Sequence, residues 1–248
     1  MGSLNDLDAA EVIILEADGL IDDKHGYGTP IHRRLQESGI KSKIFPVQEN
    51  IDELDSLPAK PLILSGGMTE VTADIAWILK FKKFILDIIT KNQESGPIQP
   101  VFGICFGAQL IVEAYSPGSV RYLDDPEIGT SKITLDIPEH HIFKGISGQF
   151  DAYSFHYNQI WSDDVTVISD HLHKGHTFIQ AFEIPNGHAY GVQFHPAFSY
   201  DEMKTLFMTY KQLIKELGFD IEPIIQTLPI LSGNERILLN FLSEAGNR

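Results

Sequence analysis

The hydrophobic pattern of the first half of the chain alternates between short apolar runs and longer segments with helical spacing. Continuous apolar runs predict strands that are buried on both faces, as in a parallel sheet. Apolar positions three or four residues apart predict amphipathic helices. The predicted strands are 12–15, 43–45, 61–64 and 101–104, and the predicted helices are 29–38, about 72–89 and 108–115. This order favours an open α/β fold, with a mostly parallel central sheet and helices on both faces.

From residue 116 onward the apolar runs are shorter and the turns follow more closely, which predicts a small, partly antiparallel β extension. The predicted strands are 119–122, 132–135, 165–169, 177–183 and 188–194. Asn186-Gly187 predicts a two-residue hairpin turn between the last two strands. Helices are expected over 199–217 and 235–245. We expect one α/β domain over residues 1–218, followed by a helical tail over 219–248 that packs on this domain or on a partner.

Composition narrows the classes of partner. Hydrophobic residues make up 43% of the 248 residues, which is ample for a core, and the net charge is −15. This charge argues against binding to nucleic acid or to anionic membranes through a basic patch. The chain has one cysteine, no apolar run long enough to span a bilayer and no basic leader before an apolar stretch. We therefore expect a soluble, unexported, cytoplasmic protein without an internal disulfide.

The single cysteine, Cys105, lies directly between the predicted strand 101–104 and the predicted helix that follows it. Gly103 and Gly107 flank it at two residues on either side. Glycines at these positions allow a tight strand-to-helix turn that presents a nucleophile at the end of a sheet. The start of the helix is expected to favour the thiolate and to offer free N–H groups to an oxyanion. The pattern predicts a nucleophilic cysteine.

A cysteine nucleophile needs a base, and His195 is the histidine best placed to act as one. It follows the apolar run 190–194 directly, and the carboxyl ends of strands are where sites collect in open α/β sheets. The backbone N–H of Phe106 is one expected oxyanion donor. A second donor is expected in Ser65-Gly66-Gly67, after the strand 61–64, because a backbone without side chains can approach a ligand closely.

Three motifs in this order carry a family resemblance: Leu-Ser-Gly-Gly (64–67), Gly-Ile-Cys-Phe-Gly-Ala-Gln (103–109) and Gly-Val-Gln-Phe-His-Pro (191–196). Together they resemble the class I glutamine amidotransferases, most of all the glutaminase domain of GMP synthetase and its stand-alone relatives. The resemblance covers about residues 10–212. It implies a flavodoxin-like, three-layer fold. Weaker similarities lie at 127–129 and 154–157.

The resemblance implies a mechanism. The Cys105 thiolate would attack the carboxamide carbon of glutamine, and His195 would shuttle protons while a thioester forms and is hydrolysed. The N–H groups of Gly67 and Phe106 would hold the oxyanion. The positions expected to bind the substrate are Gly66, Gln109, His156 and Tyr157.

One residue departs from the family pattern. The family has His-Pro-Glu, whose glutamate orients the histidine, whereas this chain has His195-Pro196-Ala197. An orienting carboxylate fixes the tautomer of the imidazole and stabilises the imidazolium. A cysteine site tolerates its loss better than a serine site, because the thiolate is intrinsically nucleophilic. Candidates for a substitute acid are Asp201, Glu202 and Glu183.

No cofactor or metal is expected. His171, His173 and His176 could be mistaken for metal ligands, but no cysteine supports them and Lys174-Gly175 predicts a turn. We find no P-loop and expect no synthetase domain in this chain, so an ammonia acceptor would need a separate synthetase subunit or a different chemistry. A second copy of the chain is an alternative partner for the apolar C-terminal segment.

Three functions remain open from the sequence. The first is a cysteine amidase or glutaminase acting on glutamine or a γ-glutamyl-like amide. The second keeps the nucleophile but takes another amide or acyl substrate, since Ala197 and the polar loop 18–28 are unusual. The third is a degenerate site kept for binding a ligand or partner. The residues near His195 are the observation that would separate them.

Overall fold

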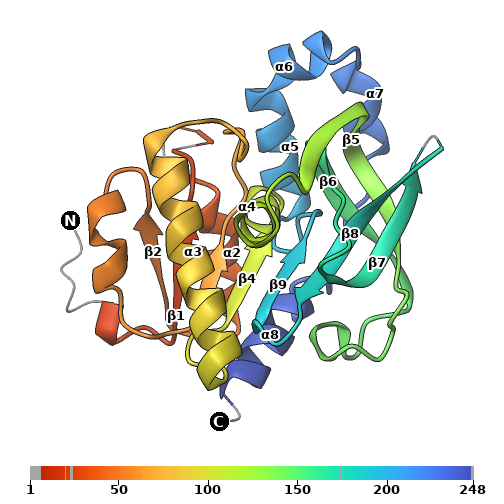
Figure 1. Cartoon of the computed structure of the whole chain (residues 1–248). Helices are drawn as coiled ribbons and strands as arrows, with labels where there is room; N and C mark the ends of the chain where they lie inside the picture. Colours follow the sequence, from red (N-terminus) through yellow and green to blue (C-terminus); the bar gives the residue numbers. More distant parts are fainter. Residues whose placement is uncertain (1–6, 20, 23–24, 174, 247–248) are drawn as a thin grey trace.

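The computed structural model describes residues 7–19, 21–22, 25–173 and 175–246. Its centre is a nine-stranded sheet with the order β2-β1-β3-β4-β9-β8-β6-β5, in which β7 pairs with β8 (Figure 1). The strands are β1 (Val12–Glu16), β2 (Ser42–Pro46), β3 (Leu62–Leu64), β4 (Val101–Ile104), β5 (Val120–Thr134), β6 (Gln149–Ile160), β7 (Thr166–His173), β8 (His176–Ile184) and β9 (Ala189–Val192).

The sheet has a parallel and an antiparallel half. Strands β2, β1, β3, β4 and β9 are paired in parallel. Strands β9, β8, β6 and β5 are paired antiparallel, as are β7 and β8. The predicted α/β fold with a parallel sheet and an antiparallel β extension is confirmed. The extension continues the same sheet, because β9 pairs with β4 on one side and with β8 on the other.

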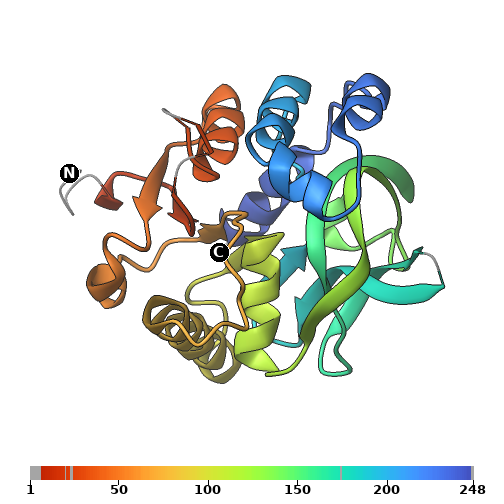
Figure 2. The same ribbon diagram turned by 90° about the horizontal axis from the view of Figure 1, so that it is seen from above.

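Helices cover both faces of the parallel half, as Figure 2 shows from above. The helices are α2 (Gly28–Glu37), α3 (Ala76–Ser95), α4 (Phe106–Tyr115), α5 (Tyr200–Thr209), α6 (Lys211–Glu216), α7 (Ile221–Thr227) and α8 (Arg236–Gly246), with short 3-10 helices η1 (Ile51–Ser56) and η2 (His141–Phe143). In β1, Ile13 and Leu15 pack in the core that contains α3 and α4, while Ile14 packs with α2 and α8. Burial on both faces explains why the strand is apolar throughout.

Several predicted boundaries were wrong. The runs 119–122 and 132–135 belong to one strand, β5, which has an irregularity between Tyr122 and Glu127. The pattern missed β6, because polar residues occupy much of its buried centre. The helix expected over 199–217 ends at Thr209 and resumes at Lys211. The expected two-residue hairpin is a four-residue connection between Ile184 and Ala189.

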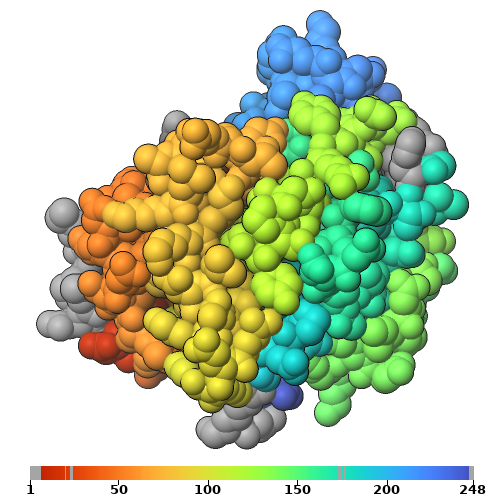
Figure 3. Space-filling model, viewed as in Figure 1, coloured from red at the N-terminus to blue at the C-terminus, as the bar shows by residue number. Residues whose placement is uncertain are grey.

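The C-terminal segments lie at opposite ends of the sheet. Helices α5, α6 and α7 form a cap that rises above the carboxyl ends of the parallel strands, visible in blue in Figure 3. Helix α8 packs through Ile237, Leu238 and Phe241 into the core that contains α2. Among the described residues, no helix combines the length and apolar character that crossing a bilayer requires.

Tyr153 in β6 holds the segment between α7 and α8 onto the domain. Its hydroxyl donates to the carbonyl of Pro229 at 2.6 Å and accepts from the N–H of Leu231 at 3.2 Å. The ring is buried. The hydroxyl therefore links the strand that borders His195 to the C-terminal segment.

Replacing Tyr153 with phenylalanine should lower the free energy of unfolding by about 1–3 kcal/mol, because the Pro229 carbonyl and the Leu231 N–H lose their partner. Urea unfolding measures this change. The matched control is Tyr115→Phe at the end of α4, whose hydroxyl only accepts a 3.5 Å contact from Gln93. Equal destabilisation of the two variants would contradict this role of Tyr153.

Candidate active site

Cys105 occupies the turn between β4 and α4 in a conformation that few non-glycine residues adopt. Its φ is 50° and its ψ is −105°. Its N–H donates to the carbonyl of Val192 at 2.8 Å, and its own carbonyl accepts from the N–H of Gln109 at 2.9 Å. These bonds fix the turn between β9 and the first turn of α4. Strain of this kind is retained where the surrounding structure holds it, often at a functional site.

The two flanking glycines are required by close backbone contacts. A Cβ on Gly103 would lie 2.5 Å from the carbonyl carbon and oxygen of Gly107. A Cβ on Gly107 would lie 2.6 Å from the Cβ and the carbonyl oxygen of Leu64 in β3. Backbone atoms cannot move aside as a flexible side chain can, so both positions exclude a side chain. The tight strand-to-helix turn predicted around Cys105 is therefore present, and the glycines are needed for the predicted reason.

His195 lies beside the same turn, shortly after β9. Its N–H donates to the carbonyl of Tyr153 at 2.8 Å, and its ring packs edge-on against Phe198 at 5.0 Å. The carbonyl oxygen of Phe155 lies near both His195 and Cys105. Its distance from Cys105 Sγ is 3.7 Å, and it also faces the His195 ring. The fold thus brings the predicted nucleophile and the predicted base to one place.

Neither ring nitrogen of His195 has a hydrogen-bond partner among the described residues. The Phe155 carbonyl lies near the ring but outside hydrogen-bonding geometry. Ala197 is buried in the core that also contains Cys105, and its carbonyl accepts from Arg34 Nε at 3.2 Å. No described carboxylate therefore fixes the tautomer of His195.

The three proposed substitute acids lie in other contacts. Glu202 accepts from Arg33 Nη1 at 2.5 Å and from the N–H of Ser199 at 2.7 Å, which closes a capping box at the start of α5. Asp201 is exposed in the first turn of the same helix. Glu183 contacts His140 Nε2 at 2.9 Å. The structure brings none of them to His195.

Burial sets the protonation of both reacting groups. It raises the pKa of the Cys105 thiol to about 12, although the N–H of Phe106 acts in the opposite direction. It lowers the pKa of His195 to about 3, and the nearby His156 adds to this lowering. The sequence predicts that the start of the helix favours the thiolate. In the structure, desolvation of Cys105 outweighs this effect of the helix, because a buried charge loses its hydration. The free site holds a neutral thiol and a neutral imidazole.

This protonation state predicts the pH dependence of alkylation. The rate constant for labelling of Cys105 by iodoacetamide should rise about tenfold per pH unit from pH 7 to 10 without a plateau, since the thiolate fraction grows throughout this range. The same cysteine in the chain unfolded in urea should level off above about pH 9. Intact mass spectrometry follows both reactions. A plateau below about pH 8 in the folded chain would instead indicate a thiolate stabilised by His195.

The segment 65–67, in which the sequence predicts a second oxyanion donor, lies next to the start of α4. A Cβ on Gly67 would lie 3.3 Å from Phe106 Cγ and 2.8 Å from Asp18 Oδ2. Asp18 accepts from the N–H groups of Met68 and Thr69 and from the Thr69 hydroxyl, so it fixes the backbone just after Gly67. The loop that carries Gly67 therefore lies against the Phe106 ring at the start of α4.

Gly66 lies between two rings of the site. A Cβ added to it would lie 3.1 Å from His195 Cε1 and 3.2 Å from Tyr27 Cδ1. Gln109 is buried in the first turn of α4. Gly66 therefore borders the predicted base, and Gln109 is joined to the predicted nucleophile through the bond from its N–H to the Cys105 carbonyl.

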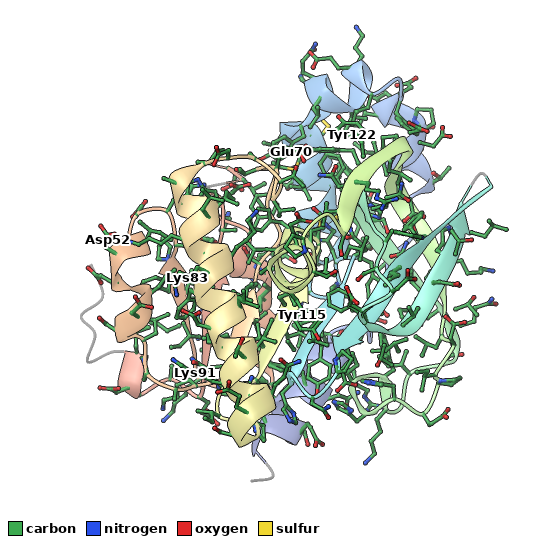
Figure 4. All side chains as sticks on the ribbon, viewed as in Figure 1. Asp52, Glu70, Lys83, Lys91, Tyr115 and Tyr122 are labelled. Atoms are coloured by element: carbon green, nitrogen blue, oxygen red, sulfur yellow. The ribbon has the colours of Figure 1, made fainter. Side chains whose placement is uncertain are left out.

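Tyr157 comes from β6 and contacts the same loop. Its hydroxyl donates to the carbonyl of Met68 at 2.9 Å, and its ring packs on Tyr122 at 5.8 Å. Burial raises the pKa of Tyr157, and the charge of Glu70 acts in the same direction. Figure 4 shows Glu70 and Tyr122 on the upper side of the molecule, near the cap. Tyr157 therefore links the loop after Gly67, through the Met68 carbonyl, to this upper side of the molecule.

His156 belongs to a buried, hydrogen-bonded group of side chains around Glu127. Its Nε2 lies 2.9 Å from Glu127 Oε2 and its Nδ1 lies 2.9 Å from the carbonyl of Asn158. His171 Nε2 and Gln180 Nε2 also contact Glu127, at 3.1 and 2.6 Å. Burial opposes ionisation of Glu127, but the two histidines hold its pKa well below the usual range. Both ring nitrogens of His156 are therefore engaged within the protein, Nε2 with Glu127 and Nδ1 with the carbonyl of Asn158.

Three histidines in β7 and β8 resemble metal ligands in the sequence. The side chain of His171 pairs with Glu127. The side chains of His173 and His176 lie outside the described residues. Among the side chains that are described, no group of three or more His, Cys, Asp or Glu is arranged to hold a metal ion.

Sequence reasoning missed two residues of the site, Asp18 and Tyr27. The position of Asp18 could have been predicted from the sequence, because an acidic residue two positions after a central strand lies at the carboxyl edge of the sheet. Tyr27 gave no signal, since no local pattern fixes the direction of its side chain. Its position is decided by packing against Gly66.

Comparisons with known proteins agree with this geometry. The family model for class I glutamine amidotransferases matches residues 19–213. The chain is 27% identical over 223 residues to the glutamine-hydrolysing GMP synthase of Fusobacterium nucleatum, covering 86% of this chain and 40% of that protein. It is 31% identical over 197 residues to a glutamine-hydrolysing GMP synthase subunit of Methanococcus maripaludis, covering 77% of this chain and 92% of that subunit. The chain thus spans about 40% of the length of the first relative.

Solved structures support the fold. A glutamine amidotransferase from Thermotoga maritima superposes with a TM-score of 0.71 at 18% identity, covering 95% of this chain and 97% of that one. A protein from Thermoplasma acidophilum that is described as a GMP synthase subunit gives a TM-score of 0.58 at 24% identity, covering 84% and 95%. With the family model matching most of its length around the Cys105 turn, this chain belongs to the class I glutamine amidotransferases.

Proposed function

We propose that this protein is a cysteine amidase that hydrolyses glutamine, or a close γ-glutamyl amide, through a thioester on Cys105. The observation that carries the proposal is the strained Cys105 turn, with its φ of 50°, placed beside His195 and the Gly66-Gly67 backbone. Membership of the family and the glutamine-hydrolysing relatives support the choice of substrate.

The reaction follows from the positions of these groups. Cys105 Sγ attacks the carboxamide carbon while His195 takes the thiol proton, so that charge develops only as the bond forms. The backbone N–H groups of Gly67 and Phe106 stabilise the oxyanion. The imidazolium then returns the proton to the departing ammonia, which leaves the γ-glutamyl thioester. Water attacks this thioester with His195 as base, and glutamate and the free thiol are regenerated.

The missing carboxylate has a consequence for the rate. A buried imidazolium without a counter-charge is costly, and the pKa of about 3 for His195 expresses this cost. General-base catalysis is most effective when the pKa of the base is near the working pH. We therefore expect slow hydrolysis in the isolated chain, limited by proton transfer to His195.

The released ammonia requires an acceptor if the protein acts in synthesis. We propose that the partner is a separate synthetase subunit, because the Methanococcus maripaludis relative is itself named a subunit of a glutamine-hydrolysing GMP synthase. Mixing the chain with a candidate synthetase should raise the rate of glutamine hydrolysis.

The decisive experiment is to incubate the purified chain with glutamine and measure ammonia and glutamate, together with the γ-glutamyl adduct on Cys105 by intact mass after an acid quench. The expected result is slow, equimolar release with a detectable adduct. A panel of γ-glutamyl amides and other small amides runs in parallel. Glutamine turnover at background with clear turnover of another amide would assign a different substrate. No adduct and no turnover with any compound would contradict the proposal and favour a binding protein.

A further inference from the structure

Tyr27 lies within the candidate site but has no role in the mechanism above. It directly precedes α2. Only 1% of it is exposed. Its ring approaches Gly66 from one side, while the His195 ring approaches the same glycine. Tyr27 therefore borders both the proposed oxyanion loop and the base.

The hydroxyl of Tyr27 has no hydrogen-bond partner among the described residues. Two other tyrosines around the site differ in this respect: Tyr153 donates to Pro229, and Tyr157 donates to Met68. A buried hydroxyl without a partner is destabilising, and buried hydroxyls in proteins are usually bonded. The orphan hydroxyl is thus a donor that the free protein leaves unused.

The neighbouring polar groups do not supply the missing acceptor. The phenol of Tyr210 faces Tyr27 from the cap, but outside hydrogen-bonding geometry. Both oxygens of Asp18 are occupied: Oδ1 accepts from the Thr69 hydroxyl at 2.6 Å and from Gln48 Nε2 at 3.1 Å, and Oδ2 accepts from the backbone of Met68 and Thr69.

The Tyr27 phenol stays protonated at neutral pH. Burial raises its pKa well above the ordinary value, and Tyr210, Asp18 and Cys105 act in the same direction. A neutral, buried phenol can donate a hydrogen bond to an acceptor that enters the site.

We propose that the Tyr27 hydroxyl donates a hydrogen bond to a carboxylate oxygen of the bound substrate. The inference rests on the proposed amidase function and narrows its substrate class to amides that carry a second oxygen acceptor, as glutamine does. The reacting carbonyl already has the Gly67 and Phe106 donors, so the Tyr27 hydroxyl binds a group that does not change during the reaction. Such a contact stabilises the ground state and the transition state equally.

The test is Tyr27→Phe in the full chain, which removes the hydroxyl and keeps the ring. We expect the KM for glutamine to rise about 10- to 100-fold with kcat within about twofold, as for a hydrogen bond to a charged group. The melting temperature should stay the same or rise, because an unpaired hydroxyl is lost. The matched control is Tyr115→Phe, at the far end of α4, with unchanged kinetics.

A second readout does not depend on turnover. A γ-diazoketone analogue of glutamine should label Cys105 more slowly in Tyr27→Phe than in the wild type, whereas iodoacetamide should label both equally. Selective slowing in a chain that hydrolyses no amide would keep the inference and reject the proposed function. Equal slowing with both reagents, a lowered melting temperature with a KM change, or no change would overturn the inference. Failure of the analogue to label the wild type would also overturn it.

Discussion

Replacing Cys105 with alanine should reduce amide hydrolysis by at least about 10³-fold, to the level of the assay background, because the residue supplies the bond-forming atom. The γ-glutamyl adduct should disappear with it. The variant should remain folded, since alanine tolerates the φ of 50° as well as cysteine does and the flanking glycines are untouched. Ammonia release and intact mass measure the two effects.

The control for this variant is its melting temperature, which should lie within a few degrees of the wild type. If Cys105→Ala lost both its activity and its fold, the result would not test the role of the thiol. Cys105→Ser is therefore measured together with Cys105→Ala. Serine keeps the size and geometry of the side chain but is a far weaker nucleophile without a strong base. Wild-type turnover by either variant would place the reaction at another residue.

Replacing Ala197 with glutamate should raise kcat/KM for glutamine by about 10²-fold. In a serine triad the loss of the orienting carboxylate costs about 10⁴-fold, and a cysteine site depends on it less. A glutamate at this position would accept a hydrogen bond from the unpartnered His195 ring and offset the charge of the imidazolium. The change should appear mainly in kcat, because proton transfer occurs in the transition state.

A matched control separates charge from packing at position 197. The cavity of about 220 Å³ that borders Ala197 is lined by Arg34, Glu37 and Tyr153 and not by His195, so the expected gain requires the glutamate to turn from this cavity toward the ring. The matched control is Ala197→Gln, which fills the same volume without a charge and should leave the rate near that of the wild type. An equal effect of glutamate and glutamine would show that packing, rather than a carboxylate, limits the site.

Labelling rates give a second measure of the same variant. With a carboxylate beside the ring, the pKa of His195 should rise from about 3 toward its ordinary value. A protonated His195 would in turn lower the pKa of the Cys105 thiol. The pH profile of alkylation should therefore shift to lower pH in Ala197→Glu and stay in place in Ala197→Gln.

Much of the fold could be predicted because its elements have strong local patterns. The continuous apolar run at the start of β1 predicted a strand buried on both faces, and the structure divides Ile13 and Ile14 between the two cores. Strand β6 could not be predicted, because His156 and Asn158 in its centre are polar. Their burial depends on Glu127 and Glu70, which come from distant segments.

The nucleophile turn is encoded locally, since Gly103 and Gly107 are required by backbone contacts within a few residues of Cys105 or across one strand. The protonation state of that nucleophile depends instead on the folded chain. Burial of Cys105 and His195 is the sum of packing from many segments, and it outweighs the local effect of the helix start. Likewise, Ala197 was evident from the sequence, but the unpartnered ring nitrogens of His195 depend on where every neighbouring carboxylate of the described chain lies in space.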